Sequence, residues 1–248
     1  MTLRAPLFPG ATGITELSVY HWPAADGVHG GSPHMHLLCA EAYVVVAGTG
    51  AVETLSPAGA AVTPLEEGDV VWYTPGVVHR SINSGDLKVI AVMQNSGLPE
   101  AGDAVMTFPA AALTSPEAYS AAASLAPTPS HTVEQSARAR RDLAMTGFDR
   151  LKSALEKGDR QPLLAFYRAA AALVAPRIEA WRRLVTEGPL AQAAASLDRL
   201  DELADGETAY LEDAMIARIP APSGHSYGMC GTLRAYDPIR EAGEVQLR

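Results

Sequence analysis

Between about residue 14 and residue 94, short hydrophobic runs rich in β-branched residues alternate with turn sequences. The first run shows the pattern clearly, because Leu17, Val19 and His21 alternate with Ser18 and Tyr20, as in a half-buried strand. The later runs cover residues 43–47, 51–55, 60–65, 70–73, 77–82 and 87–94. Strands that are separated by turn signals every ~8–12 residues are typical of a β-sandwich or barrel.

After Phe108 the hydrophobic pattern takes on a helical period. Residues 109–126 are rich in alanine and predict partly helical structure, whereas the Pro127-Thr128-Pro129 sequence predicts a stiff connector. Helices are then predicted at residues 132–158, 163–174, 176–186, 189–203 and 208–219. Because the connections between them are short, we expect an antiparallel helical bundle.

The chain therefore predicts an α+β protein in four parts. Residues 1–110 form the β-barrel, 111–130 a linker, 131–219 the helical region and 220–248 an irregular tail rich in Gly and Pro. Packing of this tail on the barrel is an alternative to a free tail.

Composition excludes several classes of function. The formal net charge is −9, and residues 1–125 hold 3 Lys or Arg against 11 Asp or Glu, which disfavours a nucleic-acid partner. No segment approaches the ~18 apolar residues of a membrane span, and the first ten residues lack the apolar run of a signal peptide. Cys39 and Cys230 make a poor case for a disulfide framework. We expect a cytoplasmic protein with reduced thiols and no membrane partner.

Four side chains with metal-ligand chemistry occur at suggestive spacings. His34 and His36 are two residues apart, so on a strand both imidazoles project from one face. Glu41 follows after a bend, and His79 follows the Thr74-Pro75-Gly76 turn at the head of another strand. Three imidazoles and one carboxylate suit a divalent transition metal ion such as Zn, Mn, Fe, Ni or Co.

This two-part pattern resembles the two signature motifs of the cupin superfamily. The resemblance implies that His34, His36, Glu41 and His79 are the ligands of one metal ion, and that the fold is a double-stranded β-helix, or jelly-roll barrel. It further implies structural roles in turns and strands for Gly48, Gly68, Gly76 and Asn83. Two positions depart from the pattern, because Thr74 replaces a proline and the glycine before the first histidine is displaced to Gly27.

Side chains near these motifs are candidates for a substrate pocket: Tyr43, Trp72, Ser81 and Met93. His21 and His29 precede the first motif, and surface placement is the simpler interpretation for both. His225 and Cys230 match no zinc motif and stay unassigned. No residue is assigned as a catalytic acid or base.

Arg138, Arg140 and Arg141 form a basic run on a predicted helix. Because acidic residues lie nearby in the sequence, we interpret this run as a solvated helix face.

Cupins with this ligand set include isomerases, decarboxylases and dioxygenases, so the resemblance implies metal-assisted chemistry on a small molecule. The first hypothesis is a lyase, isomerase or oxygenase acting on a sugar-like or organic-acid substrate that coordinates the metal. The alternatives are an Fe(II)-dependent dioxygenase and a non-enzymatic module that senses a small ligand. By analogy with other cupins we expect a homodimer.

Overall fold

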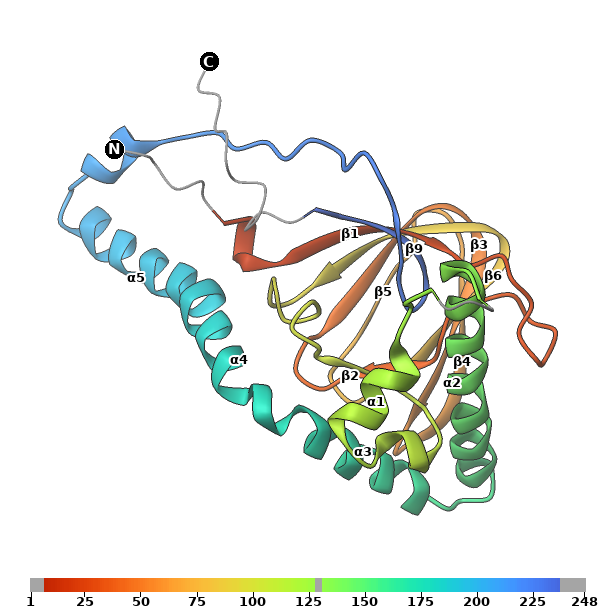
Figure 1. Ribbon diagram of the computed structural model, residues 1–248. Helices are drawn as coiled ribbons and strands as arrows, with labels where there is room; N and C mark the ends of the chain where they lie inside the picture. The colour runs from red at the N-terminus through yellow and green to blue at the C-terminus, as the bar shows by residue number, and fades with distance from the viewer. Residues whose placement is uncertain (1–6, 128–130, 237–248) are drawn as a thin grey trace.

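A computed structural model describes residues 7–127 and 131–236, and the parts of the predicted barrel and tail at residues 1–6 and 237–248 lie outside this description. An antiparallel sheet dominates the fold, with strand order β4-β3-β6-β1-β9-β8 (Figure 1). The strands of this sheet are β1 (Gly13–Val19), β3 (Glu41–Ser56), β4 (Gly59–Leu65), β6 (Val78–Met93), β8 (Ser226–Tyr227) and β9 (Gly231–Tyr236). Three further strands complete the barrel: β2 (His34–His36), β5 (Val70–Tyr73) and β7 (Ala104–Met106).

β3 and β6 are each one long strand where the sequence predicted two. The Gly48-Thr49-Gly50 sequence does not form a turn, because it lies in an irregularity of the ladder where the register between β3 and β6 shifts. Gly48 has φ +77°, and a Cβ atom there would overlap the backbone of Gly85 and Asp86. Glycine at this position therefore lets the strand bend and continue.

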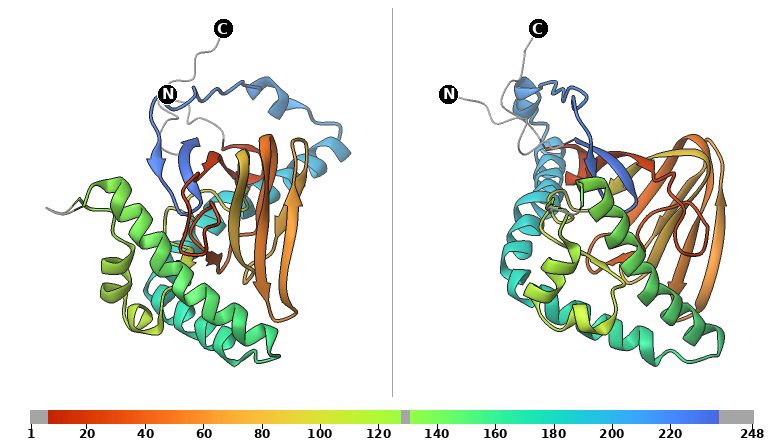
Figure 2. Two further views of the ribbon diagram at one scale, coloured as in Figure 1. Left: turned by 90° about the vertical axis from the view of Figure 1, so that its right-hand side faces the viewer. Right: turned by 45° about the vertical axis from the view of Figure 1, so that its right-hand side comes forward.

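The barrel interior is lined by alternating side chains of its strands, as the period of two requires. One buried cluster fills it: Leu17, Val19, Tyr43, Val45, Val52, Leu65, Tyr73, Leu87, Val89, Ala91 and Cys230. A second apolar core lies between the barrel and the helices and includes Leu55, Val78, Phe148 and Leu163. The helices therefore bury one outer face of the barrel (Figure 2).

In the described parts of the chain, five α-helices lie between β7 and β8: α1 (Pro116–Ala123), α2 (Val133–Glu156), α3 (Gln161–Val174), α4 (Ile178–Val185) and α5 (Ala191–Ala204). Thr132 and Gln135 form a reciprocal capping box at the start of α2. Gly147 of α2 lets the helix approach the carbonyl of Thr107. The Thr107 hydroxyl donates to the carbonyl of Ala144 at 2.8 Å, which ties α2 to the barrel.

The expected antiparallel bundle is not confirmed. The chain stays helical through Ala175–Arg177 and Thr186–Leu190, so α3, α4 and α5 follow one another in a bent rod (Figure 1). Proline can occupy the first turn of a helix without breaking it, as Pro176 does in the Ala175–Arg177 segment. Pro189 lies inside the Thr186–Leu190 segment, and the chain stays helical through it. The helix predicted at residues 208–219 is only a 3-10 turn, Ala209–Asp213.

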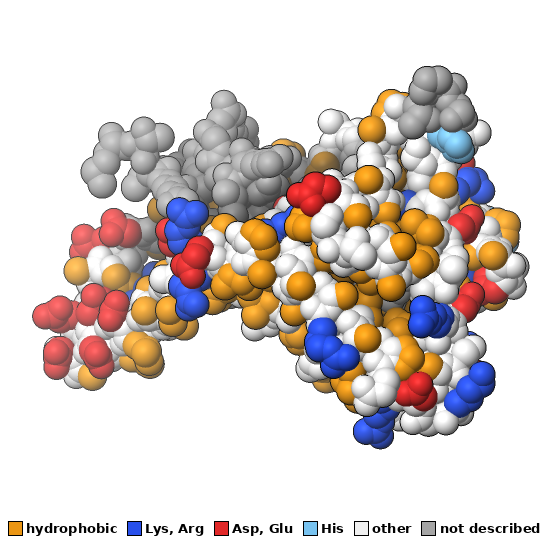
Figure 3. Space-filling view, turned by 60° about the horizontal axis from the view of Figure 1, so that its bottom comes forward, with side chains coloured by type: hydrophobic (Ala, Val, Ile, Leu, Met, Phe, Trp, Pro, Cys, Tyr) orange, Lys and Arg blue, Asp and Glu red, His pale blue; other side chains and the backbone are white. Residues whose placement is uncertain are grey.

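α5 lies at the far end of the rod, where acidic side chains gather around exposed hydrophobic ones (Figure 3). Residues 214–225 then run back to the barrel without regular structure, and β9 pairs with β1 (Figure 1). In the tail, Ser226–Tyr227 and Gly231–Tyr236 are therefore strands of the barrel sheet.

None of the helices in the described parts of the chain is long and apolar enough to span a bilayer. The expected homodimer and cytoplasmic location stay predictions.

Candidate metal centre

His34, His36, Glu41 and His79 converge inside the barrel. One potential ligand atom from each lies within 4.8 Å of those of the other three, and all four residues are buried. His34 and His36 share a face of β2, and His34 is paired directly with His79 of β6. Glu41 is the first residue of β3, so three strands bring the four side chains together. The structure thus places the four predicted ligands in a cluster that is able to bind a metal ion.

Backbone carbonyls orient two of the imidazoles. His34 Nδ1 lies 2.9 Å from the carbonyl oxygen of Ser32, and His79 Nδ1 lies 3.2 Å from that of Val77. Because a carbonyl only accepts hydrogen bonds, each Nδ1 carries the proton when the ring is neutral. The unprotonated Nε2 lone pairs of both rings are then left available to a cation.

A buried carboxylate orients the third imidazole. Asp103 accepts a hydrogen bond from His36 Nδ1 at 3.0 Å, and also from the backbone amides of Leu38 (2.7 Å) and Cys39 (3.1 Å). Burial alone would raise the pKa of Asp103, but the hydrogen bond and charge of His36 and the amides of Cys39 and Leu38 together outweigh burial and lower that pKa. Asp103 is therefore an anion that fixes both the His36 ring and the bend between β2 and β3.

The charges in the cluster are strongly coupled. Burial opposes ionisation of Glu41, but the neighbouring imidazoles of His36 and His79 hold its pKa well below the usual range. Burial would lower the pKa of His36, yet its hydrogen bonds to Asp103 and Glu41 raise that pKa to about 9. Burial and the neighbouring imidazoles lower the pKa of His34, so this ring is neutral.

The donor set fits a cation. His79 Nε2 is buried and has no hydrogen-bond partner among the described residues, although it lies 3.3 Å from Glu41 Oε2. A bare imidazole lone pair and a carboxylate oxygen are both acceptors, so they cannot bond to each other. His36 Nε2 is also 3.3 Å from the same oxygen. A metal ion held by the cluster would satisfy the lone pair of His79 Nε2, which the described structure leaves unpaired.

The barrel interior next to the cluster carries hydroxyl and thiol groups. Tyr73 donates a hydrogen bond to Glu41 Oε2 at 3.1 Å, and the two residues are paired between β5 and β3. Tyr43 accepts from Ser81 at 3.3 Å and contacts Cys230 Sγ at 3.6 Å. Burial raises the pKa of Tyr43 and Tyr73 well above the usual range, so both hydroxyls stay protonated.

The four pocket candidates divide into two groups. Tyr43, Ser81 and Met93 are buried, and Met93 is paired with Glu41 across β3 and β6. Trp72, by contrast, is 70% exposed on the outer face of β5. This corrects the expectation for Trp72, because the pleat of β5 turns its neighbour Tyr73 inward instead.

The remaining candidate histidines lie outside the cluster. His21 is exposed, and its ring contacts that of His29 with 4.5 Å between centroids. Asn83, one of the motif positions expected to be structural, has that role. Its side chain donates a hydrogen bond to the carbonyl of Val19 and accepts one from the amide of Leu87.

Sequence reasoning missed three residues at this centre: Tyr73, Asp103 and Cys230. The alternation of β5 places Tyr73 and Trp72 on opposite faces, but it does not say which of them faces the interior. Asp103 and Cys230 carry no local signal. Cys230 reaches His34 from the far end of the chain, with Sγ 3.9 Å from Nδ1, and burial raises its pKa to about 12.

Residues 28–122 match the family model described as Cupin. This confirms the resemblance drawn from the motifs for the barrel part of the chain. A search of curated proteins finds no match to this sequence.

Solved structures with a likeness to this chain include a nucleoside dehydratase, Pac13, with 13% identity, a TM-score of 0.27, and coverage of 36% of this chain and 64% of that one. A double-stranded β-helix protein from Klebsiella pneumoniae has 22% identity and a TM-score of 0.27, covering 37% and 69% of the two chains. A predicted oxalate decarboxylase from Thermotoga maritima has 21% identity and a TM-score of 0.25, covering 33% and 63%. The match to Pac13 thus spans about 64% of its length, and none of these activities transfers to this chain at such similarity.

Proposed function

Because residues 28–122 form a cupin domain around a buried cluster of three histidines and one glutamate, we propose that the protein is a metal-dependent enzyme. In this proposal the cluster binds one divalent transition metal ion, and the substrate is a small oxygen-rich molecule, sugar-like or an organic acid. The observation that carries it is His79 Nε2, a buried lone pair without a hydrogen-bond partner in the described structure, which lies beside the Glu41 carboxylate.

The ligand types support Zn, Mn, Fe, Ni or Co, because imidazole nitrogen and carboxylate oxygen bind all of them. Such an ion, when bound, supplies Lewis-acid polarisation of a substrate carbonyl or hydroxyl group. Four protein ligands leave room for substrate oxygen on an ion that takes five or six ligands.

The residues of the chain have three tasks in this proposal. Asp103 holds the His36 ring, and the carbonyls of Ser32 and Val77 hold the other two rings. Tyr73 donates a hydrogen bond to Glu41, which fixes the carboxylate and shares its charge. The apolar barrel interior excludes water, which strengthens every electrostatic interaction at the centre.

One observation favours the second candidate, an Fe(II)-dependent dioxygenase. Among the described groups next to the cluster, the hydroxyls of Tyr43 and Tyr73 and the thiol of Cys230 keep their protons at neutral pH. Glu41 is ionised, but it serves as a ligand in this proposal. A general base is therefore not evident, and oxidation by dioxygen relies less on one than isomerisation does.

Elemental analysis of the purified protein tests the metal site. We expect one divalent ion per chain in the wild type and its loss in His34→Ala and His79→Ala. His21→Ala is the matched control, because His21 is exposed outside the cluster. Unchanged metal content in both cluster variants would refute the site.

Turnover of a panel of sugars and organic acids after reconstitution with each metal tests the activity. Conversion that requires both Fe(II) and air favours the dioxygenase, whereas conversion without oxygen favours a lyase or isomerase. Tight metal binding with saturable ligand binding and no turnover would refute the enzyme and leave the sensing module.

A further inference from the structure

The three arginines on α2 do not form the solvated face that the sequence predicted. Arg138 is the most exposed, and it forms an ion pair with Glu134 at 2.7 Å. Its guanidinium also lies 4.3 Å from the ring centroid of Trp22. This side chain therefore has both a counter-ion and a stacking partner.

Arg141 is buried, and its hydrogen-bonding capacity is well used. It donates to the carbonyls of Trp22 (2.8 Å), Gly30 (3.2 Å) and Pro23 (2.8 Å). Its Nε donates to the carboxylate of Asp142 at 2.7 Å. Arg141 thus joins α2 to the loop before β2 and has an anionic neighbour.

Arg140, between them, is different. It is only 8% exposed, and its single hydrogen bond among the described residues runs from Nη2 to the carbonyl of Gly228. Its Nε is buried without a partner, and no carboxylate in the described parts of the chain lies within ion-pair distance of it. A guanidinium has five N–H donors, so most of its capacity is unused.

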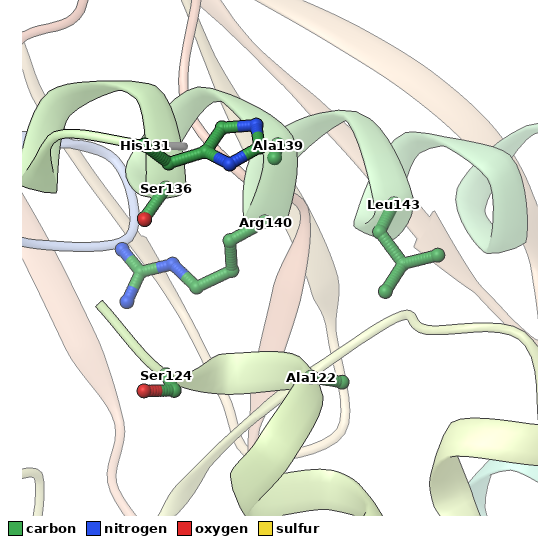
Figure 4. Close-up of a pocket in the computed structure, with 7 residues that line it drawn as sticks. All are labelled: Ala122, Ser124, His131, Ser136, Ala139, Arg140 and Leu143. Atoms are coloured by element: carbon green, nitrogen blue, oxygen red, sulfur yellow. The ribbon is translucent and has the colours of Figure 1, made fainter. Parts of the chain in front are cut away.

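A cavity of about 210 Å³ lies beside this guanidinium, between α1 and the first turns of α2. Arg140 extends across it between Ser136 of α2 and Ser124, which follows α1 (Figure 4). Ala139 and Leu143 add an apolar wall. The lining therefore combines the guanidinium of Arg140, the imidazole of His131 and two hydroxyls with a small hydrophobic surface.

The electrostatics of this cavity favour an anion. A buried charge without a counter-ion is unfavourable, and burial lowers the pKa of Arg140 without removing its charge at neutral pH. Ser136 lies near the N-terminal end of α2, where the helix dipole is positive. Glu134, the acid of the same turn, is already paired with Arg138.

We propose that this cavity is a binding site for a small oxyanion, a carboxylate or phosphate group, held by the guanidinium of Arg140 and the hydroxyls of Ser124 and Ser136. A planar guanidinium matches both kinds of oxyanion through paired N–H donors. The cavity volume admits a small metabolite whose apolar part contacts Ala139 and Leu143. This site is separate from the histidine cluster and does not depend on the metal proposal.

Calorimetric titration of the full chain with sodium phosphate and, separately, with sodium acetate tests the site at constant ionic strength, with sodium chloride as the blank. We expect saturable binding of at least one of the two anions. Binding of phosphate alone identifies a phosphorylated ligand, and binding of acetate alone identifies a carboxylate. Absence of saturable binding for both would overturn the proposal.

Variants then locate the site. Arg140→Gln is expected to weaken binding by about tenfold or more, because it removes the charge that strengthens these hydrogen bonds. Arg138→Gln is the matched control and is expected to bind like the wild type. Equal binding by Arg140→Gln and the wild type would overturn the assignment.

Arg140 also holds the Gly228 carbonyl, so Arg140→Gln could unfold the chain. Circular dichroism checks this, and Ser136→Ala and Arg140→Lys provide variants that keep the charge. We expect a few-fold weaker binding in both. If Arg140→Gln unfolds, unchanged affinity in both of these variants would overturn the proposal.

Discussion

Replacement of Asp103 by asparagine tests how the metal centre is built. Asp103 Oδ2 accepts from His36 Nδ1 and from the amide of Cys39, while Oδ1 accepts from the amide of Leu38. Asparagine has the same shape but only one acceptor oxygen. One side of its amide must therefore direct N–H groups at donors that are already in place.

The magnitude follows from these contacts. If the amide nitrogen faces His36 and Cys39, two donors lose their acceptor in a buried site, at a cost of ~1–3 kcal/mol each. If the amide flips, only the Leu38 amide loses its acceptor, so we expect a loss of unfolding free energy of about 1–3 kcal/mol. The negative charge behind His36 is lost in either orientation. Because such outer partners set the orientation and basicity of a ligand, metal affinity should fall by roughly 10–100-fold.

Chelator competition measures the affinity, and urea unfolding of the metal-free protein measures the stability. Asp69→Asn is the matched control, because Asp69 accepts from the Glu66 amide at 2.8 Å in an exposed turn away from the cluster. We expect the control to bind metal like the wild type. A folded Asp103→Asn protein that binds metal as tightly as the wild type would refute the role of Asp103.

Two further predictions concern the packing of the tail and the loop before β2. Gly31→Ala should lower the free energy of unfolding in urea by about 2 kcal/mol or more, because the added Cβ would overlap the backbone of Cys230. Gly224 faces open space, so Gly224→Ala should leave this free energy unchanged. Burial would raise the pKa of Asp26, but the hydrogen bonds and charge of Arg80, together with the Val28 amide, outweigh burial and lower that pKa. The pair therefore stabilises the fold above about pH 4 and loses this effect as pH falls through the folded pKa. The wild type should therefore exceed Asp26→Asn in free energy of unfolding by at most about 1 kcal/mol, because the carboxylate is exposed. This difference should shrink between about pH 5 and pH 3, and a constant difference would contradict this assignment.

The cluster was predictable from strand periodicity together with the resemblance to the cupin motifs, which implied that Glu41 and His79 join the two histidines. The period of two in a strand puts His34 and His36 on one face, and the turn before β6 delivers His79 to the neighbouring strand. The prediction for Trp72 was wrong because strand periodicity does not show which face of a strand is the interior. The strand was predicted correctly, but the sequence of β5 does not state which of two adjacent aromatic residues faces the interior.

The helical region shows where local pattern stops being informative. Gly188 and Pro189 are typical of a helix boundary, yet the chain stays helical from α4 into α5 through a π-helical turn. Whether such a sequence ends a helix depends on what the next segment packs against. Leu197, Leu200 and Leu203 of α5 remain exposed, so packing against other described helices does not fold the rod back into a bundle.

The tail could not be placed from sequence because its contacts join the two ends of the chain. β9 pairs with β1 over residues 231–236, although more than two hundred residues separate the partners. The sequence of a six-residue strand does not specify its position in a sheet, because β-propensity depends on the neighbouring strands. The sequence therefore suggested a separate barrel and tail, which the structure joins in one sheet.

This interlocking explains what the helices contribute to the barrel. Arg141 satisfies carbonyls of the loop before β2, and Arg140 holds the Gly228 carbonyl at the turn that leads to Cys230. Without α2 these buried carbonyls would lack their partners, and without β9 the strand β1 would become an exposed edge. The helical region therefore supports the loop before β2 and the turn before Cys230, and Cys230 in turn contacts His34 of the cluster.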